Sequence, residues 1–339
     1  MLIGVLTAGG DCPGLNAAIR GVVTRAVAGD SEVIGFEDGW GGLMEGRHRP
    51  LTRDDVRGLL VRGGTVLGTS RIDPYVHGDG LASVQATLDQ TGVERLVVIG
   101  GDGTLRTASR LHGDGLGVIG VPKTIDNDIA GTDVSFGFHT AVQIVTDAID
   151  RLTTTAEAHN RVMVVEVMGR TTGWIASYAG MAGGAEAILI PEEPYDLDDL
   201  AARLVARHAA GHSYSIVVVA EGVRPPDADA VTTGVDAFGF ERLGGVGAVI
   251  ASYLERLTGF ESRTMTLGHL QRGGTPTAFD RILATRLGVA AAEAALERRS
   301  GVMMGLRGDD IVAVDLDEAC RSVRQLDPKR HREAAWFFA

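Results

Sequence analysis

Residues 95–111 read RLVVIGGDGTLRTASRL and place a strand pattern, a glycine-rich turn and a helix pattern in direct succession. The run 95–100 is short, apolar and rich in β-branched residues, as expected of a buried strand. Residues 104–111 have the apolar spacing of an amphipathic helix. Strand, turn and helix in this order form the repeating unit of α/β proteins with parallel sheets.

The same alternation continues along most of the chain. Strand patterns occur at residues 2–7, 32–36, 95–100, 117–121, 161–168, 187–190, 214–220 and 264–268. Helix patterns occur at residues 15–27, 83–88, 104–111, 139–152 and 197–208. We therefore predict an α/β fold of two doubly wound, Rossmann-like lobes with mainly parallel sheets and the active site in the cleft between them.

The predicted division of the chain follows the two series of strands. The break is expected near Gly137. One lobe comprises residues 1–137 plus about 271–312, and the other comprises residues 138–270 plus about 313–339. Residues 223–245, rich in Pro, Asp and Gly, break the alternation and are predicted to form a long surface excursion.

The composition limits the classes of function. A net charge of −12 provides no domain-wide basic field, so we expect no nucleic-acid partner. No apolar run approaches the roughly 20 residues of a membrane helix, and the opening MLIGVLTAGGD is expected to be a first strand rather than a leader. With Cys12 and Cys320 as the only cysteines, a reducing compartment is favoured. We expect a soluble cytoplasmic protein with no membrane partner.

Six polar or glycine-rich segments directly follow predicted strands. They are GGDCPG (9–14), GGDGT (100–104), PKTIDND (122–128), MGR (168–170), EG (221–222) and GHLQRGG (268–274). Ligands of open parallel sheets bind at the carboxyl ends of the strands. These segments are therefore expected to meet at one ligand site.

The two glycine-rich turns that open helices are candidate phosphate sites. In GGDCPGLNAAIR and GGDGTLRTA, backbone N–H groups and a helix N-terminus can face phosphate oxygens without an intervening Cβ. The alternative is that both are merely tight connections, and neither is a Walker A loop. Asp102 is a candidate magnesium ligand beside the phosphates, or a helix N-cap.

Residues 122–133, PKTIDNDIAGTD, supply carboxylates in a tight turn after the strand pattern 117–121. Asp126 is our candidate for the base that accepts a proton as a hydroxyl attacks phosphorus. Thr124 is expected to donate to a phosphate, and Asp128 to support a metal or the loop. The alternative is a cluster of Asx turns that satisfies its own backbone. Asp133 is expected to be structural.

Five arginines flank strand ends and are predicted to form a local anion clamp, because guanidinium groups bind phosphate in bidentate fashion. They are Arg71, Arg161, Arg170, Arg263 and Arg272. The alternative for each one is a solvated surface residue. His269, three residues before Arg272, fits a grip on a sugar phosphate; otherwise it is a core histidine.

With these segments assembled, the chain resembles a 6-phosphofructokinase of the bacterial type. The match runs from LTAGGDCPGLNAAIRG through GGDGT, PKTIDND, EVMGR and AEG to TLGHLQRGGTPTAFDRILATR, roughly residues 1–290. A GGDG loop also occurs in kinases of NAD and of lipids. PKTIDND together with GHLQRGG is far more specific.

The resemblance implies transfer of the γ-phosphoryl group of ATP to the 1-hydroxyl of fructose 6-phosphate, with Mg²⁺. The lobe that begins the chain would bind the donor, and the other lobe fructose 6-phosphate. The implied catalytic residues are Asp126, Thr124 and Arg170. The implied nucleotide contacts are Gly10, Arg71, Ile72, Gly101, Asp102, Gly103, Thr104 and Lys123, and the metal ligands are Asp102 and Asp128.

The implied contacts of fructose 6-phosphate form a larger set. They are Thr124, Ile125, Asp126, Arg161, Met168, Gly169, Arg170, Glu221, Arg263, His269, Leu270, Gln271 and Arg272. In the family, residues matching Arg161 and Arg263 reach the 6-phosphate from a neighbouring subunit. A homotetramer, or at least a dimer, is therefore expected.

The donor signature is mixed. In the family, glycine at Gly103 accompanies ATP, whereas aspartate there accompanies pyrophosphate and would repel the α-phosphate. Lys123 instead stands where most ATP enzymes carry glycine and pyrophosphate enzymes carry lysine. We favour ATP, because ATP requires the space that Gly103 leaves and only tolerates an added lysine. The alternative is a pyrophosphate-dependent enzyme with the same acceptor.

The effector pocket of the family is only partly present. Arg20 and Arg53 match its basic residues, but Thr24 and Thr153 stand where arginines are expected, and Arg25 could compensate in part. We therefore predict weakened or altered control by ADP and phosphoenolpyruvate. Two other classes remain: a nucleotide-binding dehydrogenase, disfavoured because GGDCPG is not GxGxxG, and a non-catalytic sugar-phosphate sensor.

Overall fold

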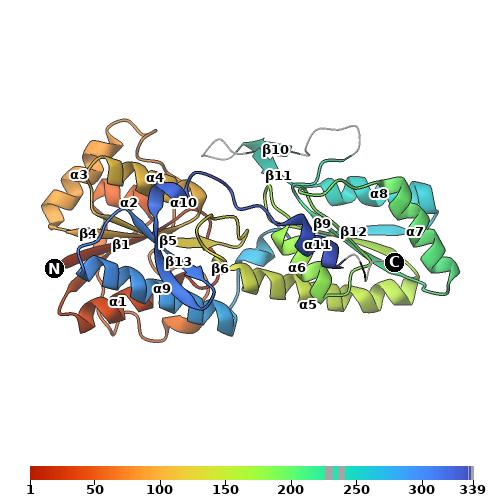
Figure 1. Ribbon diagram of the computed structural model, residues 1–339, viewed down its shortest axis with the longest axis horizontal. Helices are drawn as coiled ribbons and strands as arrows, with labels where there is room; N and C mark the ends of the chain where they lie inside the picture. Colours follow the sequence, from red (N-terminus) through yellow and green to blue (C-terminus); the bar gives the residue numbers. More distant parts are fainter. Residues whose placement is uncertain (226–231, 236–240, 335, 337–339) are drawn as a thin grey trace. The chain divides into compact units, whose positions relative to one another are not determined.

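The computed structural model describes residues 1–225, 232–235, 241–334 and 336. Contacts within the chain define two compact units. Unit 1 comprises Met1–Thr140 and Arg272–Arg324, and unit 2 comprises Ala141–Gln271 and Gln325–Ala339. Each unit is built on its own sheet (Figure 1).

Unit 1 contains an eight-stranded sheet. Its path is β14-β13-β5-β4-β1-β2-β3, with β6 beside β5; β2–β3 and β13–β14 are antiparallel and the other pairs are parallel. The strands are β1 (Leu2–Ala8), β2 (Glu32–Phe36), β3 (His48–Pro50), β4 (Arg95–Gly100), β5 (Val118–Thr124), β6 (Phe136–Gly137), β13 (Val302–Arg307) and β14 (Asp310–Asp315). The inner strands β1, β4 and β5 are buried almost throughout, which explains their continuous apolar runs.

Helices cover both faces of this sheet. They are α1 (Leu15–Ala28), α2 (Trp40–Glu45), α3 (Gly80–Thr91), α4 (Asp102–Gly113), α9 (Ala278–Leu296) and α10 (Leu316–Ala319), with a 3₁₀ turn η1 (Leu59–Val61). Figure 1 shows α1 and α9 on one face and α2, α3 and α4 on the other. Glycines bring α1 and α9 close together, because a Cβ at Gly21 would lie 2.6 Å from the carbonyl oxygen of Thr285.

Unit 2 contains a four-stranded parallel sheet in the order β12-β7-β9-β8. Its strands are β7 (Val162–Val167), β8 (Ala187–Leu189), β9 (Ser215–Ala220) and β12 (Ser262–Thr266). Its helices are α5 (Phe138–His159), which begins in unit 1, α6 (Trp174–Ala182), α7 (Leu197–Ala209), α8 (Val246–Thr258) and α11 (Pro328–Ala334), with a 3₁₀ segment η2 (Gly268–Arg272).

The prediction of two doubly wound lobes with mainly parallel sheets is confirmed. The helices are longer than their apolar patterns indicated; α5, for example, runs from Phe138 to His159 rather than over 139–152. The predicted excursion at 223–245 contains a two-stranded hairpin, β10 (Thr232–Val235) with β11 (Glu241–Leu243). Its residues 226–231 and 236–240 lie outside the described residues.

The end of the chain divides differently from the predicted lobes. Residues 313–324 group with unit 1, whereas we predicted them in the second lobe. The reason is strand pairing, because β14 pairs with β13 over Val302↔Asp315 to Arg307↔Asp310 and so extends the unit 1 sheet. The short helix α10 then packs on α4.

A buried ion pair in unit 2 provides a test of stability. Glu186 is 7% exposed; its carboxylate accepts from the backbone N–H of Ile216 and pairs with Arg207 at 2.7 Å. Burial raises the pKa of Glu186, so the charged carboxylate depends on its partners. We expect Arg207→Ala to lower the free energy of unfolding by about 2 kcal/mol, below the usual 3–5 for a fully buried pair because Arg207 retains some exposure.

Denaturant unfolding at neutral pH measures this loss. Arg203→Ala is the matched control, since Arg203 pairs with the exposed Asp199 on the same helix, and should cost less than about 0.5 kcal/mol. The deficit of Arg207→Ala should shrink as the pH falls, because protonation of Glu186 removes the uncompensated charge. Equal losses in the two variants would contradict this assignment.

Candidate functional site

The unit 1 sheet has a topological switch point between β1 and β4. These strands are parallel neighbours whose ends coincide, with Ala8 opposite Gly100. From β1 the chain continues to β2 on one side, whereas β4 is followed by β5 on the other side. The turns GGDCPG and GGDGT therefore flank this point, which is where doubly wound sheets bind ligands.

Cationic side chains surround the first turn. Lys123 Nζ donates a hydrogen bond to the carbonyl oxygen of Gly10, and Arg272 Nη1 donates to that of Asp11 at 3.3 Å. A Cβ on Gly10 would lie 2.8 Å from Arg272 Nη1 and 3.7 Å from Arg71 Nη2. Gly10 is thus the point at which three cationic side chains approach one half-buried stretch of backbone, an arrangement suited to a phosphate group.

Lys123 lies on β5 beneath this turn. Its side chain is nearly inaccessible, and burial lowers the pKa of the ammonium group. The nearby thiol of Cys12 is fully buried, and burial raises its pKa to about 12, so it is unreactive at neutral pH. Lys123 therefore fixes the first turn to β5 and adds positive charge beneath it.

The second turn leads directly into α4. Gly101 occupies the N-cap in an extended conformation, and no side chain in the described part of the chain caps the helix there. Asp102 is the first helical residue, which excludes the N-cap alternative; it pairs with Arg106 at 2.9 Å. The first N–H groups of α4 are left for an anionic ligand.

The PKTIDND loop is held by a network of hydrogen bonds. The hydroxyl of Thr124 accepts from the backbone N–H of Asp126 at 3.0 Å, which leaves the hydroxyl proton for donation to a ligand. Ser135 Oγ donates to the carbonyl oxygen of Thr124 at 2.9 Å. Asn127 has a φ of 53° and accepts the backbone N–H of Ser135 through its side chain. The Asn127 side chain accepts from a residue eight positions away, which is not an Asx turn; it braces the loop around the buried Asp126.

Arg324 is a support for this loop that sequence reasoning missed. Its backbone N–H donates to the carbonyl oxygen of Asp128 at 2.8 Å, and its Nη1 donates to that of Asn127 at 3.2 Å. The two segments lie almost 200 residues apart in the sequence, with a separation of 197 between Asn127 and Arg324. No local signal could have shown this contact.

In unit 2, the MGR segment follows β7 in a constrained conformation. Gly169 has a φ of 144° and Arg170 one of 52°. The backbone N–H of Arg170 donates to Glu221 Oε1 at 2.9 Å, and that of Met168 donates to Gln271 Oε1 at 3.2 Å. These predicted residues are therefore brought together at the carboxyl edge of the unit 2 sheet.

The remaining predicted residues are distributed over both units. His269 and Leu270 lie exposed in η2, so the core-histidine alternative is wrong. Ile125 and Thr104 are buried, whereas Arg71 is exposed and Ile72 half-buried. Arg272, expected among the acceptor contacts, lies on the first turn of unit 1.

Two of the five arginines are not at the predicted edge of the sheet. Arg161 directly precedes β7, and Arg263 lies at the start of β12, so both are at the amino ends of their strands. Arg161 and Met168 are seven positions apart, which at about 3.3 Å per residue separates them by roughly 23 Å. The prediction of one clamp with five arginines is wrong, because a strand end alone does not distinguish the two edges.

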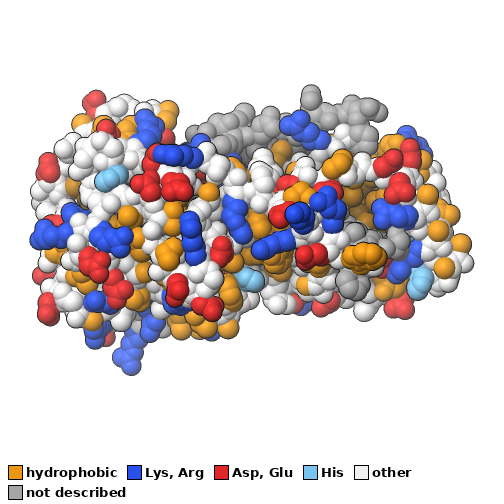
Figure 2. Space-filling view, in the orientation of Figure 1, with side chains coloured by type: hydrophobic (Ala, Val, Ile, Leu, Met, Phe, Trp, Pro, Cys, Tyr) orange, Lys and Arg blue, Asp and Glu red, His pale blue; other side chains and the backbone are white. Residues whose placement is uncertain are grey.

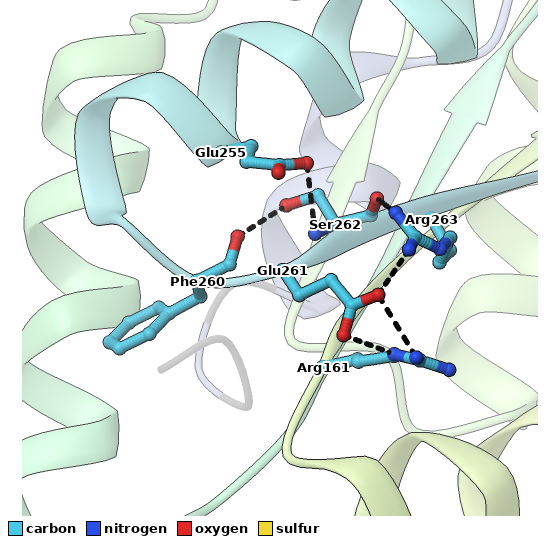
Figure 3. Close-up of polar contacts among 6 residues, drawn as sticks. All are labelled: Arg161, Glu255, Phe260, Glu261, Ser262 and Arg263. Atoms are coloured by element: carbon cyan, nitrogen blue, oxygen red, sulfur yellow. Dashed lines mark hydrogen bonds and ion pairs between the residues drawn. The ribbon is translucent and has the colours of Figure 1, made fainter.

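Figure 3 shows the cluster at this amino edge. Arg161 donates to both oxygens of Glu261, through Nε at 2.8 Å and Nη2 at 2.9 Å. Arg263 Nη2 donates to Glu261 Oε1, and its Nη1 donates to the carbonyl oxygen of Ser262 at 3.2 Å. One carboxylate thus bridges two guanidinium groups from neighbouring strands.

Comparison with known proteins identifies the family. The model of the phosphofructokinase family matches residues 2–295. The chain belongs to the phosphofructokinase family. It is 52% identical over 341 residues to a pyrophosphate–fructose 6-phosphate 1-phosphotransferase of Amycolatopsis methanolica, with both chains covered completely. It is also 52% identical over 338 residues to ATP-dependent 6-phosphofructokinase 3 of Streptomyces coelicolor, covering 98% of this chain and 99% of the relative.

Solved phosphofructokinases share the fold of this family member. The phosphofructokinase of Saccharomyces cerevisiae is 33% identical with a TM-score of 0.83; the match covers 94% of this chain and 45% of the yeast chain. The chain therefore spans less than half of that yeast chain. A pyrophosphate-dependent phosphofructokinase of Marinobacter aquaeolei, 23% identical with a TM-score of 0.82, shares the fold, with 97% of this chain and 86% of that chain covered.

Side chains of both charges lie on the described surface. On the described part of the face in Figure 2, Lys and Arg side chains lie among Asp and Glu, without a continuous basic surface. No helix among the described residues is sufficiently long and apolar to span a bilayer. Within the described residues, three or more His, Cys, Asp or Glu side chains do not gather into a metal site.

Proposed function

We propose that the chain is an ATP-dependent 6-phosphofructokinase, which transfers the γ-phosphoryl group of MgATP to the 1-hydroxyl of fructose 6-phosphate. The observation that carries the proposal is the short connection between the cationic turn at Gly10 and the candidate base Asp126. Lys123, whose ammonium contacts Gly10 in the cationic turn, is three residues before Asp126 on the braced loop. A candidate base is thereby held in the loop directly after β5, the strand whose Lys123 contacts the proposed phosphate site.

The candidate site residues of unit 1 would have distinct tasks in this reaction. The backbone of the Gly10 turn and the N-terminus of α4 would bind the donor phosphates, with Lys123, Arg71 and Arg272 balancing their charge. Asp126 would accept the proton of the attacking hydroxyl. The Thr124 hydroxyl would donate to a phosphoryl oxygen, since its own lone pair already accepts the N–H of Asp126.

Unit 2 would bind the sugar phosphate. Gly169 and Arg170 are held in left-handed conformations by the Glu221 carboxylate, and a Cβ on Gly222 would lie 2.1 Å from the carbonyl oxygen of Arg170. This packing fixes the backbone of Arg170 at the carboxyl edge of the sheet. We assign Arg170 to the transferring phosphoryl group, with the remaining contacts in Met168, Gly169, Glu221, His269, Leu270 and Gln271.

Magnesium fits the oxygen donors of unit 1. Mg²⁺ in kinases is held by one or two carboxylates together with substrate phosphates, so a cluster of three protein ligands is not required. Asp102, at the start of α4, and Asp128, in the braced loop, are the residues that would hold it. When bound, the ion would supply charge neutralisation on the donor phosphates.

A pyrophosphate donor is the second candidate, and specific observations favour it. Of the two relatives that are 52% identical, one is named for pyrophosphate and the other for ATP. In addition, Lys123 places a buried ammonium group in the donor turn. We favour ATP because Lys123 is engaged with the Gly10 carbonyl and so braces the turn, while Gly103 leaves room in the first turn of α4. Assays with each donor in turn decide between the two.

The proposal predicts a product that spectroscopy can identify. Incubation with fructose 6-phosphate and MgATP should give fructose 1,6-bisphosphate, seen by ³¹P NMR as a second sugar-phosphate resonance. Omission of fructose 6-phosphate should leave ATP intact. Release of inorganic phosphate without a bisphosphate product would overturn the proposal.

We place the enzyme in the cytoplasm, in keeping with its two free thiols, Cys12 and Cys320.

The position of the amino-edge arginines supports a homo-oligomer. Arg161 and Arg263 lie roughly 20 Å along the strands from the Met168–Arg170 segment of the same unit, with β7 between them. This distance supports a contribution of the two arginines to the fructose 6-phosphate site of a second copy of the chain. We propose that they bind the 6-phosphate of a neighbouring subunit, within a dimer or tetramer.

Control by effectors is expected to be weak. Arg25, which could have replaced the arginine missing at Thr24, pairs with Glu293 of α9 at 3.0 Å. The hydroxyl of Thr153 donates to the carbonyl oxygen of Ile149 within α5. We expect millimolar ADP or phosphoenolpyruvate to change the KM for fructose 6-phosphate less than about threefold, since roughly 0.7 kcal/mol of coupling would be needed for more. A steep response to both that Arg20→Ala abolishes would contradict this.

A further inference from the structure

At the amino edge of the unit 2 sheet, specific backbone and side-chain contacts hold Arg161 and Arg263 in place. Arg161 and Arg263 belong to adjacent parallel strands, paired in the register Ser262↔Val162 and Arg263↔Met163. The backbone N–H of Val162 also donates to the carbonyl oxygen of Glu261. The backbone pairing therefore places the side chain of Glu261 beside both arginines.

Glu261 uses one edge of each guanidinium group. On Arg161 it occupies Nε and Nη2, and on Arg263 it occupies Nη2, while Nη1 of Arg263 donates to Ser262. A guanidinium has five N–H donors, so Arg161 retains those on Nη1 and one on Nη2. Two guanidinium groups are thus fixed side by side with donors still to spare (Figure 3).

The charges of the cluster leave an excess of one positive charge. The hydrogen bond from Arg161, with the nearby charges of Arg161 and Arg263, holds the pKa of Glu261 below its usual range, so Glu261 is ionised at neutral pH. Arg263 is 54% and Arg161 27% exposed, so the remaining donors are accessible to an anion. A single carboxylate also reduces the mutual repulsion of the two cations before an anion arrives.

We propose that Glu261 is a positioning residue that preassembles Arg161 and Arg263 into one phosphate-binding pair for the neighbouring subunit. This inference rests on the proposed function, which assigns the two arginines to the 6-phosphate. Glu261 does not touch the sugar phosphate; it sets the separation and direction of the two guanidinium groups. Long side chains that are already ordered lose less conformational entropy on binding, so the pair binds phosphate more tightly than two independent arginines.

The test is Glu261→Gln, which keeps the shape and removes the charge that holds both arginines. At metal sites, removing the group that orients a ligand lowers affinity by about 10-fold to 100-fold, and we expect the lower end here. The KM for fructose 6-phosphate should rise about tenfold, with kcat within about twofold, because the 6-phosphate is bound equally in ground and transition states. The KM for ATP should not change.

Glu255→Gln is the matched control. Glu255 accepts the backbone N–H of Ser262 at 3.3 Å and makes no ion pair with either arginine among the described residues. It should leave the KM for fructose 6-phosphate unchanged. Thermal denaturation and sedimentation should show that both glutamine variants keep the stability and the assembly of the parent.

Arg161→Ala and Arg263→Ala separate this inference from the function on which it rests. If both raise the KM for fructose 6-phosphate and Glu261→Gln does not, or lowers it, the positioning role is wrong and the proposed function stands. If neither arginine variant changes that KM, the two arginines do not bind the 6-phosphate of a neighbouring subunit, and the inference fails as well. Dissociation of Glu261→Gln would show that Glu261 holds the interface, and would also overturn the proposal.

Discussion

Replacement of Asp126 by asparagine should lower kcat by about 10²–10⁴-fold, the loss typical of a positioned general base. Asp126 is 3% exposed and lies in the loop that Thr124, Ser135 and Asn127 brace. Asparagine has nearly the same volume, so the loop should keep its hydrogen bonds while the group that accepts the proton is lost. Steady-state assays at saturating donor and acceptor measure the change, and KM should remain within a few-fold.

Asp133→Asn is the matched control for this prediction. Asp133 belongs to the same stretch, but it is exposed and accepts the backbone N–H of Gly308 at 2.8 Å. Its replacement should alter kcat by less than about twofold, as for surface changes away from a site. A loss below about tenfold for Asp126→Asn would show that Asp126 is not the base.

Gly103→Asp should reduce kcat/KM for ATP by about three orders of magnitude. Two like charges about 4 Å apart repel by roughly 4 kcal/mol at an effective dielectric constant of 20, which corresponds to about 10³-fold. Gly103 lies in the first turn of α4, beside Asp102. A carboxylate there would occupy the place proposed for the α-phosphate, which pyrophosphate does not fill. Activity with pyrophosphate, if any is present, should therefore suffer far less.

Gly103→Ala distinguishes bulk from charge. Alanine adds a Cβ and favours the helix that begins at Asp102, so its effect should stay within about tenfold for either donor. The assay is kcat/KM for ATP and for pyrophosphate in the parent and both variants. Equal losses for the two donors in Gly103→Asp would mean that the residue does not face the α-phosphate.

Local periodicity predicted most of the fold. In unit 1, the inner strands are buried almost throughout, so apolar runs such as residues 95–100 carry a direct signal. The turns GGDCPG and GGDGT carry their own signal, since backbone approach to an anion requires glycine. The addition of β14 and α10 to unit 1 had no such signal, because edge strands reveal their pairing only through contacts far away in sequence.

The candidate site was predicted less completely than the fold. Arg161 and Arg263 were taken as members of one clamp, although Arg161 directly precedes β7 and Arg263 lies at the start of β12, so both are at the amino edge. The position of each arginine at the beginning of its strand could already be seen in the sequence. By contrast, the contact of Arg272 with Asp11 spans 261 residues, and that of Arg324 with Asn127 spans 197, so only the folded chain could reveal them.

The most direct test compares the two donors with one acceptor. The purified protein is supplied with fructose 6-phosphate and Mg²⁺, and formation of fructose 1,6-bisphosphate is followed with ATP and with pyrophosphate in parallel. We predict turnover with ATP, with Lys123 acting as a brace of the Gly10 turn. Turnover with pyrophosphate alone would contradict this account and show that Lys123, rather than Gly103, determines the donor.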